Sequence, residues 1–427
     1  MLQAGVLDAI TGSNVRVVLL VPSSKVEYFV KAFANSKVFV EGISIPQKAF
    51  EGVVMLFAFG LFNIHNRVVR DWKKKKWWLY LAAVLINNTL AYVPATRVWL
   101  RAFSSQYLVT NALDSHIEKY KPDLVVTTDS FFREDRAICI TAKKRGIKTI
   151  AMIRSWDNAT TKGLFLCDPD RIIVPCQVLK DELIEIHRIP SAIITVTGWP
   201  HYDTVMDGPH VSRKEFYATL GLDPERKTIL YGPGGKILYQ HDREVLVMLK
   251  RLVDTGAFTF PVQFLVRFPP GDTLDTTPID GDSHFVVDKP GTNITGRKKE
   301  SEMSALDNAH LEDSLYYADL VLTLVSTLAI DGVVFGKPVV ILGFDVPGAT
   351  KQSMSSFARR LHFKKFLNSD LLSTPRSETE FVETVNAYLQ DPTLHDKERA
   401  EVVSRYAHAL DGKSVERVSK IILSALE

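Results

Sequence analysis

Polar side chains follow several apolar runs of this sequence at the point where each run ends. Ser326 and Thr327 stand between the apolar run Leu320–Leu324 and a second apolar stretch, Leu328–Phe335. If the first run is a strand and the second a helix, the free N–H groups and the dipole of that helix suit a phosphate or pyrophosphate. Asp331, one turn further on, could accept from a sugar or ribose hydroxyl. The alternative is that Ser326 or Thr327 only caps the helix.

A glycine-rich segment, Gly232-Pro233-Gly234-Gly235-Lys236, follows another apolar run, Thr228–Tyr231. Glycines allow the backbone to approach a ligand closely, because they have no side chain in the way. The segment is not a Walker loop, and Ile237 occupies the third glycine position of the dinucleotide-binding fingerprint. It therefore indicates either a loop that contacts a ligand or a plain turn.

Three side chains with acid–base chemistry also stand at or near the ends of apolar runs. Asp129 follows the run 123–128, Asp157 follows the run 148–153, and His201 lies further along the chain. A carboxylate or an imidazole in such a place can take a proton from a hydroxyl nucleophile. An aspartate there can equally cap a helix or a turn.

Apolar runs of strand length alternate with helical patterns along most of the chain, which predicts an α/β fold with parallel sheets. Ligands of such sheets collect at the carboxyl ends of the strands, where the polar side chains above are expected. Residues 50–120 read as helices, and the polar residues 271–310 are predicted to form a long loop. The predicted strands span residues 15–21, 37–40, 123–128, 148–153, 171–175, 192–197, 228–231, 263–267, 320–324 and 338–342.

The strand pattern stops in a turn-rich stretch, residues 206–226, and then restarts. We therefore predict two α/β domains joined by this linker, an N-terminal one over residues 1–205 and a C-terminal one over residues 227–412. Residues 413–427 are predicted to form a helix that could cross back to the N-terminal domain. A cleft between two such domains is the expected ligand position.

The composition limits the class of protein. Against 49 acidic residues the chain has 52 lysines and arginines, and the resulting net charge of +3 is too small to indicate nucleic-acid binding. Its longest apolar runs, residues 52–62 and 77–86, are much shorter than the ~20 residues of a membrane-spanning helix. Three cysteines without a CxxC pair favour buried thiols, and the N-terminus lacks the basic start of a signal peptide. We expect a cytoplasmic protein.

A basic and aromatic stretch occupies residues 67–81. Residues 67–76 carry six positive charges and one negative charge, and Trp77-Trp78-Leu79-Tyr80-Leu81 follows directly. Lysines beside interfacial aromatic side chains are typical of segments that bind an anionic lipid surface. The alternative is a solvated charge run that leads into a core helix. Nucleic acid is disfavoured because the chain has no second matching patch, so residues 67–81 suggest a peripheral membrane contact.

Four segments between residues 120 and 345 are distinctive, and the last of them is the most specific. They are Ser155-Trp156-Asp157-Asn158-Ala159-Thr160-Thr161-Lys162-Gly163, Thr197-Gly198-Trp199-Pro200-His201-Tyr202-Asp203, Leu265-Val266-Arg267-Phe268-Pro269, and Ala318-Asp319 through Ser326-Thr327-Leu328-Ala329-Ile330-Asp331 to Gly336-Lys337-Pro338. These segments resemble GT-B-fold glycosyltransferases of the bacterial surface-polysaccharide type. Within that group, the chain is similar to the CDP-glycerol glycerophosphotransferases and the non-hydrolysing UDP-N-acetylglucosamine 2-epimerases.

The resemblance implies two Rossmann-like, doubly wound domains that face a cleft. It also implies a nucleotide-sugar donor on the C-terminal domain, a glycan or glycolipid acceptor on the N-terminal domain, and no metal or other cofactor. Ser326 and Thr327 would bind the donor phosphate, and Asp331 would bind the sugar or ribose. The further donor-binding residues would be Gly234, Gly235, Lys236 and Arg267.

An inverting transfer also needs a base that takes the proton of the acceptor hydroxyl. Asp157 is our first candidate because it lies in the most distinctive segment, Asp129 is the second, and His201, near the hinge, is the third. The alternatives that stay open are a CDP-polyol phosphotransferase, a UDP-sugar 2-epimerase and a non-catalytic GT-B-like scaffold. The acceptor-side residues would be Trp156, Asn158 and Lys162.

Overall fold

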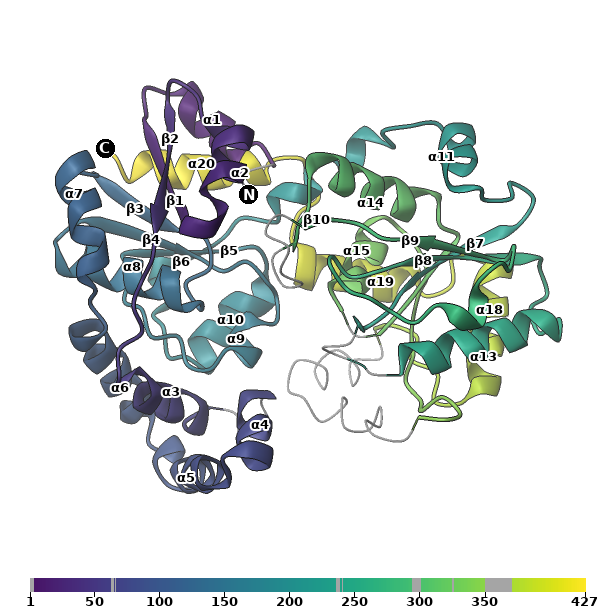
Figure 1. Ribbon diagram of the computed structural model, residues 1–427, viewed down its shortest axis with the longest axis horizontal. Coiled ribbons are helices and arrows are strands. Elements are labelled where there is room, and N and C mark those ends of the chain that lie inside the picture. Colours follow the sequence, from purple (N-terminus) through teal and green to yellow (C-terminus); the bar gives the residue numbers. More distant parts are fainter. Residues whose placement is uncertain are drawn as a thin grey trace. The chain divides into compact units, whose positions relative to one another are not determined.

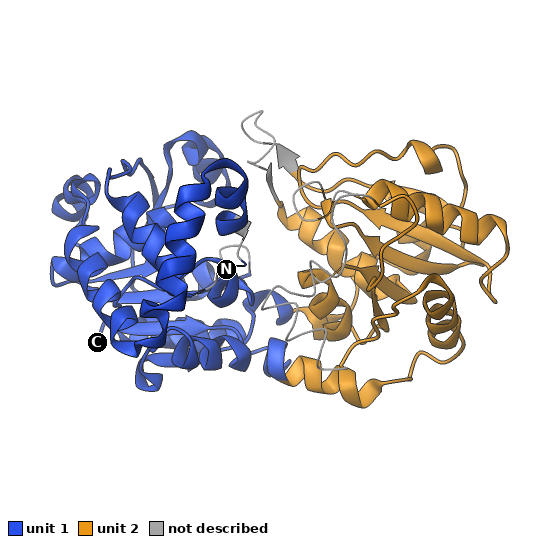
Figure 2. Ribbon diagram, turned by 90° about the horizontal axis from the view of Figure 1, so that it is seen from below, with its two compact units in different colours: residues 1–203, 405–427 blue, residues 204–404 orange. Residues whose placement is uncertain are grey.

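The computed structural model describes residues 4–62, 65, 67–235, 239, 241–293, 301–324, 326–349 and 371–427. The chain forms two compact units (Figure 2). Unit 1 comprises Met1–Asp203 and Arg405–Glu427, and unit 2 comprises Thr204–Ser404. Unit 2 is therefore an insertion between two parts of unit 1. Residues 206–226, which the sequence analysis assigns to a linker, lie within unit 2 and contain helix α11 (Arg213–Leu220).

The strands of unit 1 are parallel (Figure 1). A four-stranded sheet has the order β3-β4-β5-β6, and β1 pairs with β2 in a separate sheet. Apolar β-branched residues favour these strands, and Ile172, Ile173 and Val174 of β5 are fully buried. The predicted parallel α/β architecture is confirmed here. The strands are β1 (Val17–Pro22), β2 (Val38–Ile43), β3 (Leu124–Thr127), β4 (Lys148–Met152), β5 (Arg171–Val174) and β6 (Ile194–Val196).

Helices pack against both faces of the four-stranded sheet. Because side chains alternate along a strand, Val126 of β3 contacts the cluster formed with α1 and α20, whereas its neighbour Val125 contacts the cluster that includes Ala137 and Ile138 of α8. Figure 1 shows α20 beside α1, although the two come from opposite ends of the chain. These helices are α1 (Val6–Gly12), α2 (Val26–Phe33), α8 (Arg133–Lys144), α9 (Asn158–Thr161), α10 (Gln177–Glu185) and α20 (Ser414–Ser424).

The first turn of α20 is fixed to unit 1 by polar contacts. The carboxylate of Asp203 accepts from the backbone N–H groups of Ser414 at 3.0 Å and Val415 at 2.7 Å. Gly198 has φ +85°, and a Cβ atom at this position would lie 2.4 Å from the Ser414 hydroxyl oxygen. Residues 197–203, one of the four segments noted in the sequence, therefore hold the C-terminal helix in place.

Between β2 and β3 the described chain is helical. Helix α6 anchors this helical region to the rest of unit 1, because the Arg101 guanidinium donates to the carbonyl oxygens of Phe165, at 3.2 Å, and of His187. Arg97 donates to the carbonyl of Ile186 at 2.7 Å. The elements of this part are α3 (Glu51–Gly60), α4 (Arg67–Lys75), α5 (Trp77–Asn88), the 3-10 turn η2 (Leu90–Tyr92), α6 (Pro94–Tyr107) and α7 (Asp114–Tyr120).

His187 is fully buried where the helical region meets the sheet. Its Nδ1 accepts from the N–H of Phe165 at 3.0 Å, and its Nε2 lies 2.7 Å from the carbonyl of Ala159. The neutral ring with a proton on Nε2 satisfies both contacts. Burial lowers the pKa of His187 to about 3, and the positive charges of Arg101 and Arg97 act in the same direction.

Unit 2 is built on one five-stranded parallel sheet with the order β13-β12-β7-β8-β9. From β7 the chain first adds β8 and β9 on one side and then β12 and β13 on the other. The strand order therefore reverses between β7 and β12, the point at which such sheets bind ligands. The elements are β7 (Lys227–Gly232), α13 (Asp242–Asp254), β8 (Val262–Arg267), β9 (Phe285–Asp288), β10 (Thr292–Asn293), β11 (Ser301–Glu302), α14 (Ala305–Tyr317), β12 (Leu320–Thr323), α15 (Thr327–Val334), β13 (Val339–Ile341), α18 (Glu378–Gln390) and α19 (Asp396–Val402).

The predicted long loop over residues 271–310 is wrong. Strand β9 lies in it and pairs with β8, and the ring of Phe285 stacks on Phe264 with 5.1 Å between centroids. Helix α14 starts there too, with a capping box between Ser304 and Asp307. Both elements give weak sequence signals, because β9 has four residues, of which one is buried, and α14 buries only Asp313, Ser314 and Leu315.

Acidification should destabilise unit 1 through His187. Its folded pKa of about 3 lies below the unfolded value of about 6.5, so the unfolded chain binds the proton more readily. The contribution of neutral His187 to the free energy of unfolding is therefore fully present above pH 6.5. It decreases as the pH falls toward 3, by about 2 kcal/mol between pH 7 and pH 5. Thermal unfolding at both pH values should show a smaller loss for His187→Gln than for the wild type. The half-buried His116 provides the control His116→Gln, and an equal loss in all three proteins would contradict this assignment.

Candidate functional site

Asp129 and Asn158 form a buried polar pair beyond the carboxyl ends of β3 and β4. Asp129 is 5% exposed, and Asn158, the first residue of α9, is 2% exposed. The side-chain amide of Asn158 donates to both carboxylate oxygens of Asp129, at 2.9 and 3.0 Å. The backbone N–H of Asp129 donates to the carboxylate of Asp135 at 2.6 Å, which fixes the loop. The structure thus brings together one predicted base and one predicted acceptor-side residue.

The surroundings of Asp129 give its carboxylate an unusual proton affinity. Burial raises the pKa of Asp129 to about 6, against the opposing effects of Arg154, the Asn158 hydrogen bond and Lys162. The Arg154 side chain is 72% exposed, and its Nε lies 3.6 Å from the Asp129 carboxylate. The Lys162 ammonium lies 4.9 Å from the ring centre of Phe132. A group with a pKa near 6 is ionised at neutral pH and still accepts a proton readily, as a general base must.

Asp157 makes the contacts of a residue that starts a short helix. The hydroxyls of Ser155 and Thr161 donate to its two carboxylate oxygens, the second at 3.1 Å. Its carbonyl accepts from the N–H groups of Thr160 and Thr161 at 3.0 and 2.9 Å. The neighbouring Trp156 is 5% exposed and packs edge-on against Tyr406, with ring centroids 5.7 Å apart. These contacts give both residues a local structural role.

His201, the third predicted base, lies within the segment 197–203 that holds α20. The side chain is exposed, and its ring contacts those of Trp199 and Tyr202, with centroids 5.4 and 4.2 Å apart. Trp199 in turn donates from Nε1 to the carbonyl of Tyr406 at 2.8 Å. The described contacts of His201 are therefore with aromatic side chains of its own segment, residues 197–203.

Ser326, Thr327 and Asp331 lie at the switch point of unit 2, where β12 leads into α15. The Ser326 hydroxyl lies 3.0 Å from the hydroxyl of Thr323, which also contacts the carbonyl of Gly232, at 3.0 Å, on the neighbouring β7. Ser326 is half-buried and Thr327, the first residue of α15, is exposed. The hydroxyls and the positive end of this helix can bind an anion here. The predicted contacts of these residues with a donor phosphate and a sugar or ribose stay predictions.

The glycine-rich loop after β7 is held by Asp242, which the sequence analysis missed. The N–H groups of Gly234 and Gly235 donate to the two carboxylate oxygens of Asp242, at 3.0 and 2.7 Å, and the Tyr231 hydroxyl donates to the same carboxylate at 3.1 Å. Burial raises the pKa of Asp242 to about 6, although these hydrogen bonds lower it. The signal for this role is an aspartate at the start of the helix that follows the loop. Lys236 lies outside the described residues.

Arg267 joins three elements of unit 2. Its guanidinium forms an ion pair with Asp288 of β9 and donates to the carbonyl of Asp307 in α14 at 3.0 Å. His310 of α14 lies 3.2 Å from the same Asp288 carboxylate. Burial raises the pKa of Asp288, but His310 and Arg267 outweigh this effect and hold it below its usual value. The predicted contact of Arg267 with a phosphate stays a prediction beside this structural role.

The described part of the chain contains no cluster of three or more His, Cys, Asp or Glu side chains that could hold a metal ion. All three cysteines are free and buried, as predicted. Burial raises the pKa of Cys176 to about 12, so its thiol stays protonated at neutral pH.

We compared the chain with known proteins by sequence and by fold. No protein-family model matches the chain. The chain is 23% identical over 363 residues to the lipid-A-disaccharide synthase of Geobacter sulfurreducens, which covers 81% of this chain and 84% of that protein. The UDP-GlcNAc 2-epimerase of Neisseria meningitidis bound to UDP-GlcNAc superposes with a TM-score of 0.54, at 12% identity over 100% of this chain and 95% of that one. This chain has the GT-B fold.

A second solved structure agrees with the GT-B fold. The S. aureus MnaA co-structure with UDP superposes with a TM-score of 0.50, at 14% identity over 96% of this chain and 97% of that one. The resemblance to GT-B enzymes inferred from four short segments is therefore confirmed at the level of the fold. In this GT-B chain the predicted donor-binding residues belong to unit 2, and Asp129 and Asn158 belong to unit 1.

Gly235→Ala should destabilise unit 2 more than Gly256→Ala. Both glycines have a positive φ, +71° and +65°, so alanine carries a similar backbone cost of about 1 kcal/mol at either position. A Cβ atom at position 235 would lie 2.2 Å from the Asp272 carboxylate, whereas no atom lies within 4 Å at position 256. Thermal unfolding of the two variants measures the difference, and equal losses of Tm would show that the loop is not tightly packed.

Proposed function

We propose that this GT-B protein is a glycosyltransferase that moves a sugar from a nucleotide-activated donor to a glycan or glycolipid acceptor. The observation that carries the proposal is the buried Asp129, whose raised pKa suits a base, beyond the carboxyl end of β3. Similarity to a lipid-A-disaccharide synthase supports the reaction class. Because the solved structures of similar fold hold UDP-GlcNAc or UDP, a UDP-linked sugar is the first donor to test.

Unit 2 is the proposed donor-binding half. The start of α15 offers free N–H groups, the helix dipole and the hydroxyls of Ser326 and Thr327 to the donor diphosphate. Asp331 lies one turn after Thr327 on the same face of the helix and would accept from a sugar or ribose hydroxyl. The N–H groups of Gly234 and Gly235 already bind Asp242, so the start of α15 is the stronger anion site at this edge.

Unit 1 is the proposed acceptor-binding half, with Asp129 as the base. Asp129 removes the proton of the acceptor hydroxyl while that oxygen attacks the anomeric carbon of the sugar. The bond between this carbon and the donor phosphate oxygen breaks, its electron pair remains on the nucleotide diphosphate, and the proton remains on Asp129. Asn158 orients the carboxylate through its two hydrogen bonds. The growing negative charge on the diphosphate is stabilised by the α15 N-terminus.

Asp129→Asn should lower the transfer rate by about 10²- to 10⁴-fold, because asparagine has the same shape but cannot take the proton. The wild-type rate should fall as the pH drops below about 6, where Asp129 becomes protonated. Initial rates with a labelled UDP-sugar and a membrane lipid extract, measured across pH 5 to 8, test both expectations.

The matched control is Asp157→Asn, which changes a neighbouring carboxylate that accepts from the hydroxyls of Ser155 and Thr161, and it should leave the rate within about tenfold of the wild type. Burial raises the folded pKa of Asp129 above its unfolded value, so ionisation of this carboxylate costs stability. The wild type should therefore regain this stability as the pH falls from 6 toward 4, and Asp129→Asn should not. Loss of transfer in Asp157→Asn alone would make Asp157 the base, and unchanged transfer in both variants would exclude both carboxylates as the base. Absence of transfer by the wild type would indicate a non-catalytic scaffold.

Thr327→Glu should abolish donor binding without unfolding the protein. A carboxylate in the first turn interacts favourably with the helix dipole and so should not destabilise α15. The same negative charge repels the donor diphosphate from this site. Thr327→Gln is the matched neutral control and should retain most of the affinity. The thermal shift produced by UDP, UDP-sugars and CDP-glycerol measures binding. An unchanged shift in Thr327→Glu would place the donor elsewhere.

A UDP-sugar 2-epimerase is the second candidate, because one of the solved structures of similar fold is such an enzyme. An epimerase would convert UDP-N-acetylglucosamine without any acceptor, whereas a transferase needs the acceptor before the sugar leaves the nucleotide. Analysis of the donor after incubation with the protein alone separates the two activities. Conversion of the donor under these conditions would contradict the transferase proposal.

A further inference from the structure

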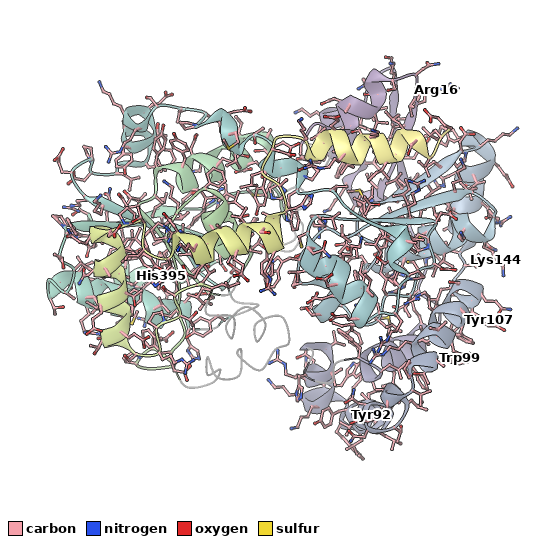
Figure 3. The ribbon with its side chains drawn as sticks, turned by 180° about the vertical axis from the view of Figure 1, so that it is seen from behind. Arg16, Tyr92, Trp99, Tyr107, Lys144 and His395 are labelled. Carbon is pink, nitrogen blue, oxygen red and sulfur yellow. The ribbon has the colours of Figure 1, made fainter. Side chains whose placement is uncertain are left out.

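A band of large apolar side chains is exposed on the helical region of unit 1. Each member is between 47% and 78% exposed. Figure 3 shows Tyr92 at the tip of this region, with Trp99 and Tyr107 further along the same side. An exposed apolar surface of this extent marks an interaction site. We call it the aromatic band, and its members are Trp77, Trp78, Leu81, Leu85, Tyr92, Val93, Val98, Trp99 and Tyr107.

The band is the outer face of well-packed helices. In α5 the opposite face is buried, because Ala83 and Ile86 pack against α3, where a Cβ atom on Gly60 would lie 2.9 Å from Ile86. The inner face of α6 is held by the buried Arg101, which donates to the carbonyl oxygens of Phe165, His187 and Arg188. On the outer face of α6, Phe103 stacks between Trp99 and Tyr107, with ring centroids 5.4 and 4.5 Å apart. Both helices therefore present their apolar outer faces on a rigid support.

A group of cations borders the band at the Trp77 end. Lys73, Lys74 and Lys75 form the last turn of α4, Lys76 follows, and all four side chains are exposed. Helix α4 packs against α5, and the Lys73 ammonium lies 5.4 Å from the ring centre of Tyr80. Exposed lysines next to exposed tryptophans match a surface that is negative outside and apolar beneath, which describes an anionic lipid bilayer.

The geometry of the helices fits a contact at the bilayer surface. No single helix in the described part of the chain is long and apolar enough to cross a membrane. Trp77–Tyr92 and Pro94–Tyr107 together reach the required length and composition, but they are bent by 113° at Val93. We propose that the aromatic band inserts shallowly into an anionic bilayer, with this bend as its deepest point, while Lys73–Lys76 bind the lipid headgroups. This inference does not depend on the proposed transfer reaction.

Sedimentation with vesicles of phosphatidylcholine, alone or mixed with phosphatidylglycerol, tests the proposal without any donor. The wild type should bind the anionic vesicles at least about tenfold better than the neutral ones, and added salt should weaken this binding. A band variant with Trp78→Ser, Tyr92→Ser and Trp99→Ser, and a charge variant with Lys73→Ser, Lys74→Ser, Lys75→Ser and Lys76→Ser, should each lose at least about tenfold in affinity.

Matched controls come from elsewhere on the surface. Met206 and Leu306 of unit 2 are 73% and 82% exposed, so Met206→Ser with Leu306→Ser removes equally exposed apolar side chains. Lys144→Ser with Lys214→Ser removes exposed lysines outside the band. Both controls should bind like the wild type, and so should Asp129→Asn, which separates failure of this inference from failure of the proposed function.

Tryptophan fluorescence supplies a second readout. Trp77, Trp78 and Trp99 are exposed, whereas Trp156 and Trp199 are buried. Lipids brominated near the headgroup should therefore quench the wild type much more than the band variant, which keeps Trp77. Equal binding by the wild type and the band variant would overturn the proposal. It would also be overturned if the band variant lost only self-association, measured by sedimentation velocity, since the band would then join two copies of the chain.

Discussion

The contact between Asp203 and the first turn of α20 joins the two chain segments that make up unit 1. Asp203 is the last residue of unit 1 before the chain enters unit 2, and Ser414 lies 211 residues further along, soon after the chain has returned. The two hydrogen bonds seat α20 so that Val418 and Ile422 complete a core with Ile150 of β4. Strand β4 leads to Asn158 and hence to the carboxylate of Asp129. The candidate base therefore depends on a helix from the other end of the chain.

Burial raises the pKa of both Asp129 and Asp242 to about 6, but the two carboxylates have different hydrogen-bond partners. The partners of Asp242 include two backbone N–H groups of the glycine loop and the Tyr231 hydroxyl, so a change at this carboxylate disturbs the loop itself. Asp129 accepts from one side-chain amide and lies near an exposed arginine. A substrate hydroxyl can approach such a group without breaking backbone structure. This difference in partners, rather than the pKa alone, is why we propose Asp129 as the base.

The sheets could be predicted from the sequence because buried parallel strands are continuous apolar runs, as in β5 and β12. Strand β9 escaped detection because it is short and at the sheet edge. At the site, the contacts that distinguish the candidate bases could not be predicted. A distinctive segment drew attention to Asp157, but hydrogen bonds to Ser155 and Thr161 give it a local role. The roles of Asp242 and His187 depend on backbone groups of other segments, and composition and spacing do not reveal such contacts.

Contacts between segments also explain why the sequence pattern of residues 67–81 predicted only part of the aromatic band, which extends to Tyr107. The lysine run is visible in the sequence, whereas the face that α5 turns outward is decided by its packing on α3. Gly60 permits this packing, since a larger residue there would meet Ile86 at 2.9 Å. With Ala83 and Ile86 turned inward, the helical period of 3.6 residues leaves Trp77, Trp78, Leu81 and Leu85 on the opposite face. One glycine contact thus determines where the aromatic side chains are presented, and the cations of α4 are placed beside them by the packing of α4 on the same helix.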